Sequence, residues 1–92
     1  MLCYLFCYDI EDDRLRDRAA TSLLKHGQRV QESVFELWFR SPAHFKQLQA
    51  ELRGLLPTNS NLRWYRLSDT ALADSGSLDA HPPRKPPAVQ IW

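Results

Sequence analysis

The fold of this chain is decided by residues 2–9, which read LCYLFCYD. The segment is short and aromatic, which argues against a helix, and both of its alternating sets of side chains are largely apolar. Strands that are covered on both faces have this pattern, because successive side chains point to opposite faces. The apolar run ends abruptly at Asp9. The pattern therefore predicts a central strand with a carboxylate at its carboxyl-terminal end.

Two amphipathic helices are expected downstream of this strand. The first has aspartates suited to the N-cap at Asp12 and Asp13, and it runs to about His26, where Gly27 stops it. The second begins at Ser41, which is followed by a proline at the first helical position, and has the most regular apolar stripe in the chain. A proline directly after its last leucine ends this second helix.

Further strands are predicted between and after the helices. Residues 29–40 alternate like a strand, but the apolar parity changes at Glu32-Ser33, which indicates a bulge or a tight turn between two strands. Residues 62–67 form another strand. Residues 69–87 hold four of the six prolines and are expected to be a loop or tail. Residues 88–92 alternate like a short strand at the end of the tail.

This order of elements predicts an α+β fold of the ferredoxin-like type, β-α-β-β-α-β, with an extra C-terminal strand. The first β-α-β unit implies a right-handed parallel crossover, and both helices then lie on one face of the sheet. The other face of the sheet still needs a cover. We therefore expect a homodimer packed sheet to sheet, in which residues 1–68 form the domain and the tail of residues 69–92 secures an edge of the sheet.

Length and composition exclude several classes of protein. The 92 residues predict one domain with little room for an enclosed pocket, and no apolar run reaches the roughly 20 residues that span a bilayer. The start lacks a basic region and a cleavage site, so no signal peptide is expected. Cys3 and Cys7 lie ~13 Å apart on one strand, too far for a disulfide. We expect reduced thiols, no structural zinc, no membrane and a cytoplasmic location.

Two motifs resemble one known family. They read YDIEDDR at residues 8–14, followed by Arg16 and Arg18, and GQRVQESVFE at residues 27–36. Together they are similar to the small CRISPR-associated endonuclease family, the second of the two universal proteins of CRISPR adaptation. The resemblance covers residues 1–68. It implies a ferredoxin-like homodimer, cleavage of RNA or DNA phosphodiester bonds with Mg²⁺ (or Mn²⁺), and service beside the CRISPR integrase in spacer acquisition for antiviral defence.

Asp9 is the predicted catalytic residue, because the resemblance places the family's metal ligand at this position. The residues support this role, since a carboxylate at the end of a central strand is held rigidly while solvent still reaches it. One carboxylate per chain is a sparse site, and a two-fold dimer would bring two together. The alternative is that Asp9 is a turn residue. Asp12 and Asp13 are explained by helix capping.

Three arginines are predicted to bind nucleic acid: Arg16 and Arg18 on the first helix and Arg29 at a strand start. Arginine forks match phosphate oxygens, although a solvated helix surface also explains the first two. The resemblance places Ser33 and Phe35 near the cleft, and Tyr8 is a further candidate beside the phosphate. Each of these three has an alternative as a packing or bulge residue, and for Phe35 we favour the dimer interface.

Two functions from different classes fit these features. The first is a metal-dependent endonuclease. The second is a non-catalytic dimeric scaffold that holds DNA and the integrase during spacer integration. The residues do not distinguish RNA from DNA as the substrate. A third possibility, a regulatory domain that binds a small ligand, requires a polar pocket for which the sequence has no signal.

Overall fold

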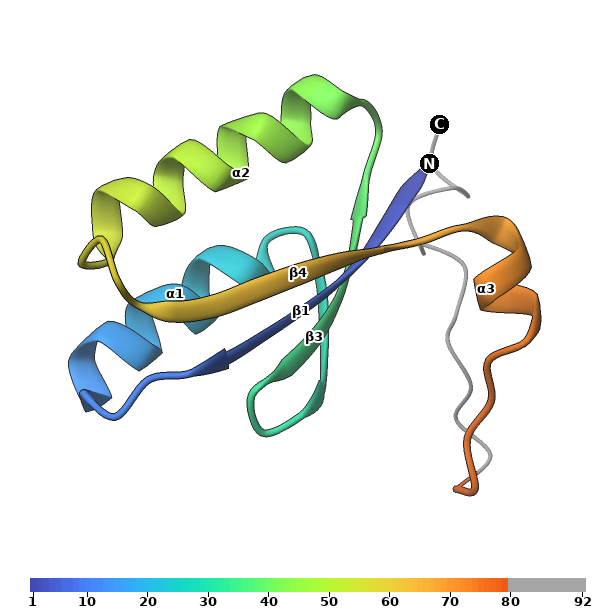
Figure 1. Ribbon diagram of the computed structural model, residues 1–92, viewed down its shortest axis with the longest axis horizontal. Coiled ribbons are helices and arrows are strands. Elements are labelled where there is room, and N and C mark those ends of the chain that lie inside the picture. Colours follow the sequence, from blue (N-terminus) through green and yellow to red (C-terminus); the bar gives the residue numbers. More distant parts are fainter. Residues whose placement is uncertain (80–92) are drawn as a thin grey trace.

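The computed structural model describes residues 1–79, which form one four-stranded antiparallel sheet and three helices (Figure 1). In chain order the elements are β1 (Leu2–Asp9), α1 (Asp13–Leu24), β2 (Gly27–Gln31), β3 (Val34–Phe39), α2 (Pro42–Leu55), β4 (Asn61–Leu67) and α3 (Asp69–Ala73). This order confirms the predicted α+β class and its β-α-β-β-α-β arrangement. Within residues 1–79, no helix is long and apolar enough to cross a membrane.

Strand β1 is central, as its two apolar faces predicted. The strand order is β2-β3-β1-β4, and Phe6 of β1 lies opposite Phe35 of β3 and Trp64 of β4. Since β2 is antiparallel to β3 and β3 is antiparallel to β1, strands β1 and β2 run in the same direction with β3 inserted between them. The predicted parallel crossover is therefore present in its split form.

The core lies between the sheet and the pair formed by α1 and α2. One alternating set of strand side chains, which includes Phe6, Tyr8 and Leu37, packs with Leu23 of α1 and Leu48 of α2. Both helices therefore cover the same face of the sheet. The other set of β1 side chains, Cys3, Leu5, Cys7 and Asp9, points to the opposite face.

Both long helices begin with the predicted caps. The Asp12 carboxylate accepts a hydrogen bond from the Leu15 amide at 2.9 Å, and the Ser41 hydroxyl accepts one from the His44 amide at 3.4 Å. Helix α1 ends at Leu24, two residues before the predicted end. Gly27 is the first residue of β2 and not a helix cap, so its predicted role was wrong.

The change of parity near Glu32 comes from a turn and a bulge together, which the sequence had offered as alternatives. A turn at Glu32 and Ser33 joins β2 to β3, and the register between the two strands shifts between Arg29 and Gln31. The bulge lets β2 end beside Val34 of β3 while β3 keeps its own alternation.

The prediction of a loop directly after Ser68 was wrong for residues 69–73. The Ser68 hydroxyl accepts a hydrogen bond from the Ala71 amide at 3.1 Å and caps α3, which has Asp69 in its first turn. The cap and the following Thr-Ala-Leu-Ala form a local helix signal, which the prolines further along the chain obscured. The predicted strand at residues 88–92 lies outside the described residues.

Gly27 is required by a close approach between β2 and β3. A Cβ atom at this position would lie 2.1 Å from the Glu36 carbonyl oxygen and 2.8 Å from the Leu37 Cα atom. Both atoms belong to the backbone, so relief requires that the strands separate. We expect Gly27→Ala to lower the free energy of unfolding by about 1–3 kcal/mol, measured by urea denaturation at fixed protein concentration.

Gly54 of α2 provides the matched control for this substitution. A Cβ atom there would meet nothing within 4 Å, and the residue lies near the end of a helix. Gly54→Ala is expected to raise the free energy of unfolding by up to about 1 kcal/mol, because alanine is the better helix former. Equal effects of the two substitutions would refute the close-approach explanation.

Candidate active site at the end of the central strand

Asp9 is the last residue of β1, and its side chain is exposed. It lies opposite Asn61, the first residue of β4. On the other side of β1, the Tyr8 amide donates a hydrogen bond to the Ser33 carbonyl oxygen in the β2–β3 turn at 3.1 Å. Both neighbours of β1 therefore hold its end in place, and the Asp9 carboxylate is presented to solvent from a rigid position.

The Asp9 carboxylate suits a hard divalent ion. Mg²⁺ and Mn²⁺ prefer oxygen ligands, and Mg²⁺ keeps several waters while using one or two carboxylates. Within residues 1–79, no group of three or more histidine, cysteine, aspartate or glutamate side chains is placed to hold a metal ion. The chemistry of Asp9 therefore fits the ion, and the described part of one chain offers no larger cluster of ligand side chains.

Asp9 belongs to the sheet face opposite α1 and α2, which we call the open face. Cross-strand pairing places these residues on it: Cys3, Leu5, Cys7 and Asp9 of β1, Val34, Glu36 and Trp38 of β3, and Asn61, Arg63, Tyr65 and Leu67 of β4. Its side chains are largely apolar, and Tyr65 retains 50% of its exposure. The row that leads from Leu5 through Cys7 to Asp9 joins the candidate site directly to this apolar surface.

The two cysteines are free thiols, as predicted, and both lie on the open face. Cys3 is buried, and burial together with the nearby Glu36 carboxylate raises the pKa of its thiol to about 12. The Cys3 thiol therefore stays protonated at neutral pH. Cys7 is half-buried and lies two residues from Asp9.

Arg16 lies beside the loop that follows Asp9. Its guanidinium donates hydrogen bonds to the carbonyl oxygens of Ile10 and Glu11 at 3.0 and 3.3 Å, and it forms an ion pair with the Asp13 carboxylate. The predicted phosphate contact would have to compete with these three interactions.

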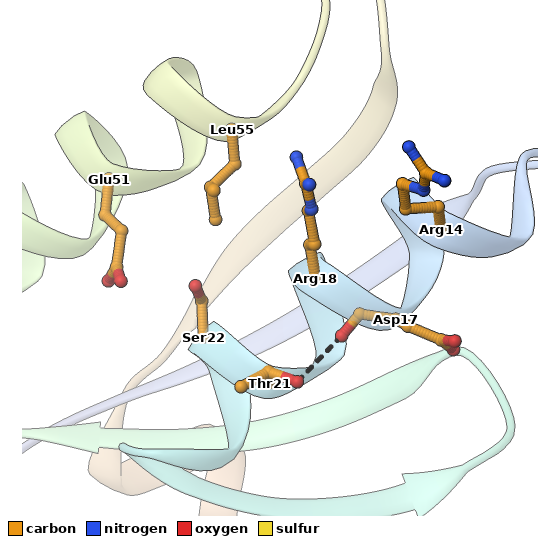
Figure 2. A pocket seen from close by; sticks show the side chains of 7 residues that line it. All are labelled: Arg14, Asp17, Arg18, Thr21, Ser22, Glu51 and Leu55. Carbon is orange, nitrogen blue, oxygen red and sulfur yellow. Dashed lines mark hydrogen bonds between the residues drawn. The ribbon is translucent and has the colours of Figure 1, made fainter.

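Arg18 faces a groove between α1 and α2 and not the strand end. Figure 2 shows its side chain beside that of Arg14, one helical turn earlier, and close to Leu55 of α2. The groove is further lined by Asp17, Thr21, Ser22 and Glu51. A hydrogen bond from Lys25 lowers the pKa of Glu51 and ties α1 to α2 at 3.0 Å. Arg14 was not among the arginines predicted to bind nucleic acid, although its spacing of four residues from Arg18 places both on one helix face.

Arg29 and Phe35 lie on the helix-covered face. The Arg29 guanidinium carbon is 5.1 Å from the centre of the Phe35 ring, within the range of a cation–π contact. The Phe35 ring is fully buried and lies 5.8 Å from the ring of Tyr8, which is also buried. Phe35 is therefore a core residue of the single chain, and its predicted place in a sheet-to-sheet interface was wrong.

The structure thus brings part of the predicted site together. Asp9, Ser33 and Arg16 lie at or beside the same end of the sheet, whereas Arg18 and Arg29 face different surroundings. Tyr8 and Phe35 lie in the core beneath this end. Asn61, the cross-strand neighbour of Asp9, was missed, because strand register has no local signal in the sequence.

Comparisons with known proteins agree with this geometry. The family model described as CRISPR associated protein Cas2 matches residues 1–74. A relative from Synechocystis sp., named CRISPR-associated endoribonuclease Cas2 3, is 41% identical over 92 residues, which are 99% of each chain. A relative from Chloroflexus aurantiacus, named CRISPR-associated endoribonuclease Cas2 1, is 44% identical over 66 residues, which are 70% of each chain.

One solved structure is similar over nearly the whole chain. A chain of a partial Cas6-RT-Cas1–Cas2 complex is 30% identical with a TM-score of 0.81, and the match covers 94% of this chain and 100% of that one. The family model and the Synechocystis relative match the segment that holds Asp9, both long helices and the four strands β1–β4. The chain therefore belongs to the CRISPR associated protein Cas2 family.

Proposed function

We propose that this chain is a metal-dependent endoribonuclease that acts in CRISPR spacer acquisition. The observation that carries the proposal is the exposed Asp9 carboxylate, fixed at the end of the central strand. The relatives named CRISPR-associated endoribonuclease favour RNA over DNA as the substrate. The family membership supports the cytoplasmic location that the sequence predicts.

The proposed active site is shared by two copies of the chain. The open face is largely apolar and leads to Asp9, so packing two open faces across a two-fold axis would bury the apolar surface and bring both carboxylates to one site. Such a pair supplies the one or two carboxylates that Mg²⁺ uses in proteins. A shared site also agrees with the finding that residues 1–79 of one chain hold no group of three or more ligand side chains.

In this proposal the residues of the chain hold and orient the site. When bound, a Mg²⁺ ion neutralises charge on the phosphate and lowers the pKa of a coordinated water. Asp9 binds the ion, and its backbone is fixed by the hydrogen bond from Tyr8 to Ser33 and by pairing with β4. The packed open faces keep bulk water away from one side of the carboxylates, which strengthens their interaction with the ion.

Metal removal tests the proposed activity. Cleavage of a labelled single-stranded RNA is expected to stop in EDTA and to return when excess Mg²⁺ or Mn²⁺ is added. A DNA strand of the same sequence, assayed in parallel, measures the preference for RNA. Cleavage that continues unchanged in EDTA would refute the metal-dependent mechanism.

A second function is favoured by one comparison. The neighbour that matches 94% of this chain comes from a complex that also contains Cas1, so we propose that this chain also serves as a dimeric scaffold beside the CRISPR integrase. The two functions separate experimentally, because a scaffold needs the dimer surface and not the Asp9 carboxylate. Spacer integration measured with an Asp9→Asn variant therefore shows whether hydrolysis is needed in adaptation.

A further inference from the structure

The loop between β1 and α1 is held by a single arginine side chain. The loop consists of residues 10–12 and connects Asp9 to the first turn of α1. One amino group of Arg16, Nη1, donates to the carbonyl oxygens of Ile10 and Glu11, and the other, Nη2, pairs with the Asp13 carboxylate. The clamped carbonyl groups belong to the two residues directly after Asp9.

The backbone of Arg16 joins the same loop. Its amide donates to the Asp12 carbonyl oxygen at 2.9 Å, while the Asp12 carboxylate caps the helix at Leu15. The Arg16 side chain retains 36% of its exposure, compared with 86% for Asp13. Arg16 is therefore partly enclosed by the loop that it binds.

These contacts distinguish Arg16 from an ordinary phosphate ligand. A guanidinium has five N–H donors, and both terminal nitrogens of Arg16 already have oxygen partners within the chain. A phosphate that took these donors would leave the Ile10 and Glu11 carbonyl oxygens without them, and Ile10 is half-buried. Release of the clamp would also free the backbone that follows the metal-binding carboxylate.

We propose that Arg16 is a positioning residue, which fixes the β1–α1 loop and through it the direction of the Asp9 carboxylate. This inference rests on the proposed function of Asp9. Its effect on catalysis follows from geometry, since a displacement of about 1 Å in a reacting group lowers rates by up to about a hundredfold. Lysine cannot replace arginine fully here, because one ammonium group lacks the planar fork that reaches two carbonyl groups and a carboxylate.

The test compares Arg16→Gln, Arg16→Lys and the control Arg53→Gln, which removes the same charge from an exposed position in the last turn of α2. Arg16→Gln is expected to lower kcat for RNA cleavage by about tenfold to a hundredfold while KM changes less than about twofold. Arg16→Lys should lie between Arg16→Gln and the unsubstituted chain. Arg53→Gln should leave both constants unchanged.

Two further measurements separate positioning from phosphate contact without relying on cleavage. The amides of residues 15 and 16 donate hydrogen bonds to Asp12 in the loop, and their exchange is expected to be at least about tenfold faster in Arg16→Gln and unchanged in Arg53→Gln. RNA affinity, measured in an Asp9→Asn background that prevents cleavage, should have the same dependence on salt with and without Arg16. A lost phosphate contact would instead reduce the salt slope by about 1.

Unchanged exchange at residues 15 and 16, or a reduced salt slope with weaker RNA binding, would overturn the assignment of Arg16. Absence of metal-dependent cleavage in the unsubstituted protein is a different outcome and refutes the proposed function. The exchange and binding measurements still determine in that case whether Arg16 clamps the loop.

Discussion

Replacing Asp9 with asparagine is expected to lower metal-dependent RNA cleavage by more than about a hundredfold. Loss of residues that merely support metal ligands costs about 10–100-fold, and a direct ligand should exceed that range. The side chain is exposed, so the free energy of unfolding should change by less than about 0.5 kcal/mol. Initial rates over a series of Mg²⁺ concentrations, together with a denaturation curve, measure both quantities.

Asp12→Asn is the matched control, because it removes the same charge three residues away. Asparagine caps a helix about as well as aspartate, so the hydrogen bond to the Leu15 amide can persist. Cleavage by this variant should stay within about twofold of the original rate. Equal losses in Asp9→Asn and Asp12→Asn would mean that the site depends on total negative charge and not on Asp9 as a ligand.

The substitution Leu5→Lys is expected to convert the dimer to a monomer and, as a consequence, to abolish RNA cleavage. Leu5 lies at the middle of β1 on the open face, and the two-fold symmetry would place one substituted side chain from each protomer in the interface. In the dimer each ammonium group and the Glu36 carboxylate opposite it would both lose water, and this pair would be about 1–4 kcal/mol less favourable than the apolar leucine. In the monomer the new side chain is tolerated, because Glu36 lies directly opposite on β3.

Leu24→Lys provides the control for Leu5→Lys. Leu5 is half-buried, whereas Leu24 is exposed, at 48%, and ends α1, so it does not lie on the open face. This variant should stay dimeric in sedimentation velocity and should cleave RNA at the original rate. A Leu5→Lys protein that remains dimeric, or a monomer that still cleaves, would contradict an active site formed across the open faces.

The sequence predicted those parts of the fold that have a local signal. The apolar pattern of residues 2–9 identified the central strand, and the capping residues located both long helices within about two residues. The same pattern placed Asp9 at the end of this strand, and the family resemblance made it the candidate metal ligand. The strand and the helices could be predicted because side-chain periodicity and helix capping depend on residues that are close together in the sequence.

The remaining features depend on contacts between distant segments. The face of the sheet on which Phe35 lies depends on the register between β3 and β1, and the bulge in β2 obscures that register in the sequence. Phe35 was therefore wrongly placed in the dimer interface. The clamp of Arg16 depends on how the loop after β1 turns back to α1. The sequence predicted Gly27 as a helix cap because the close approach of β3, which requires a glycine there, has no local signal.

We propose that two Asp9 carboxylates, one from each chain, form one active site. The most direct test is a heterodimer of the unsubstituted chain and Asp9→Asn, purified through two different tags and checked by native mass spectrometry after the assay. A shared site predicts cleavage below about one tenth of the rate of the unsubstituted dimer, because every site has lost one of its two carboxylates. Independent sites would retain half of that rate, and this result would contradict the shared active site.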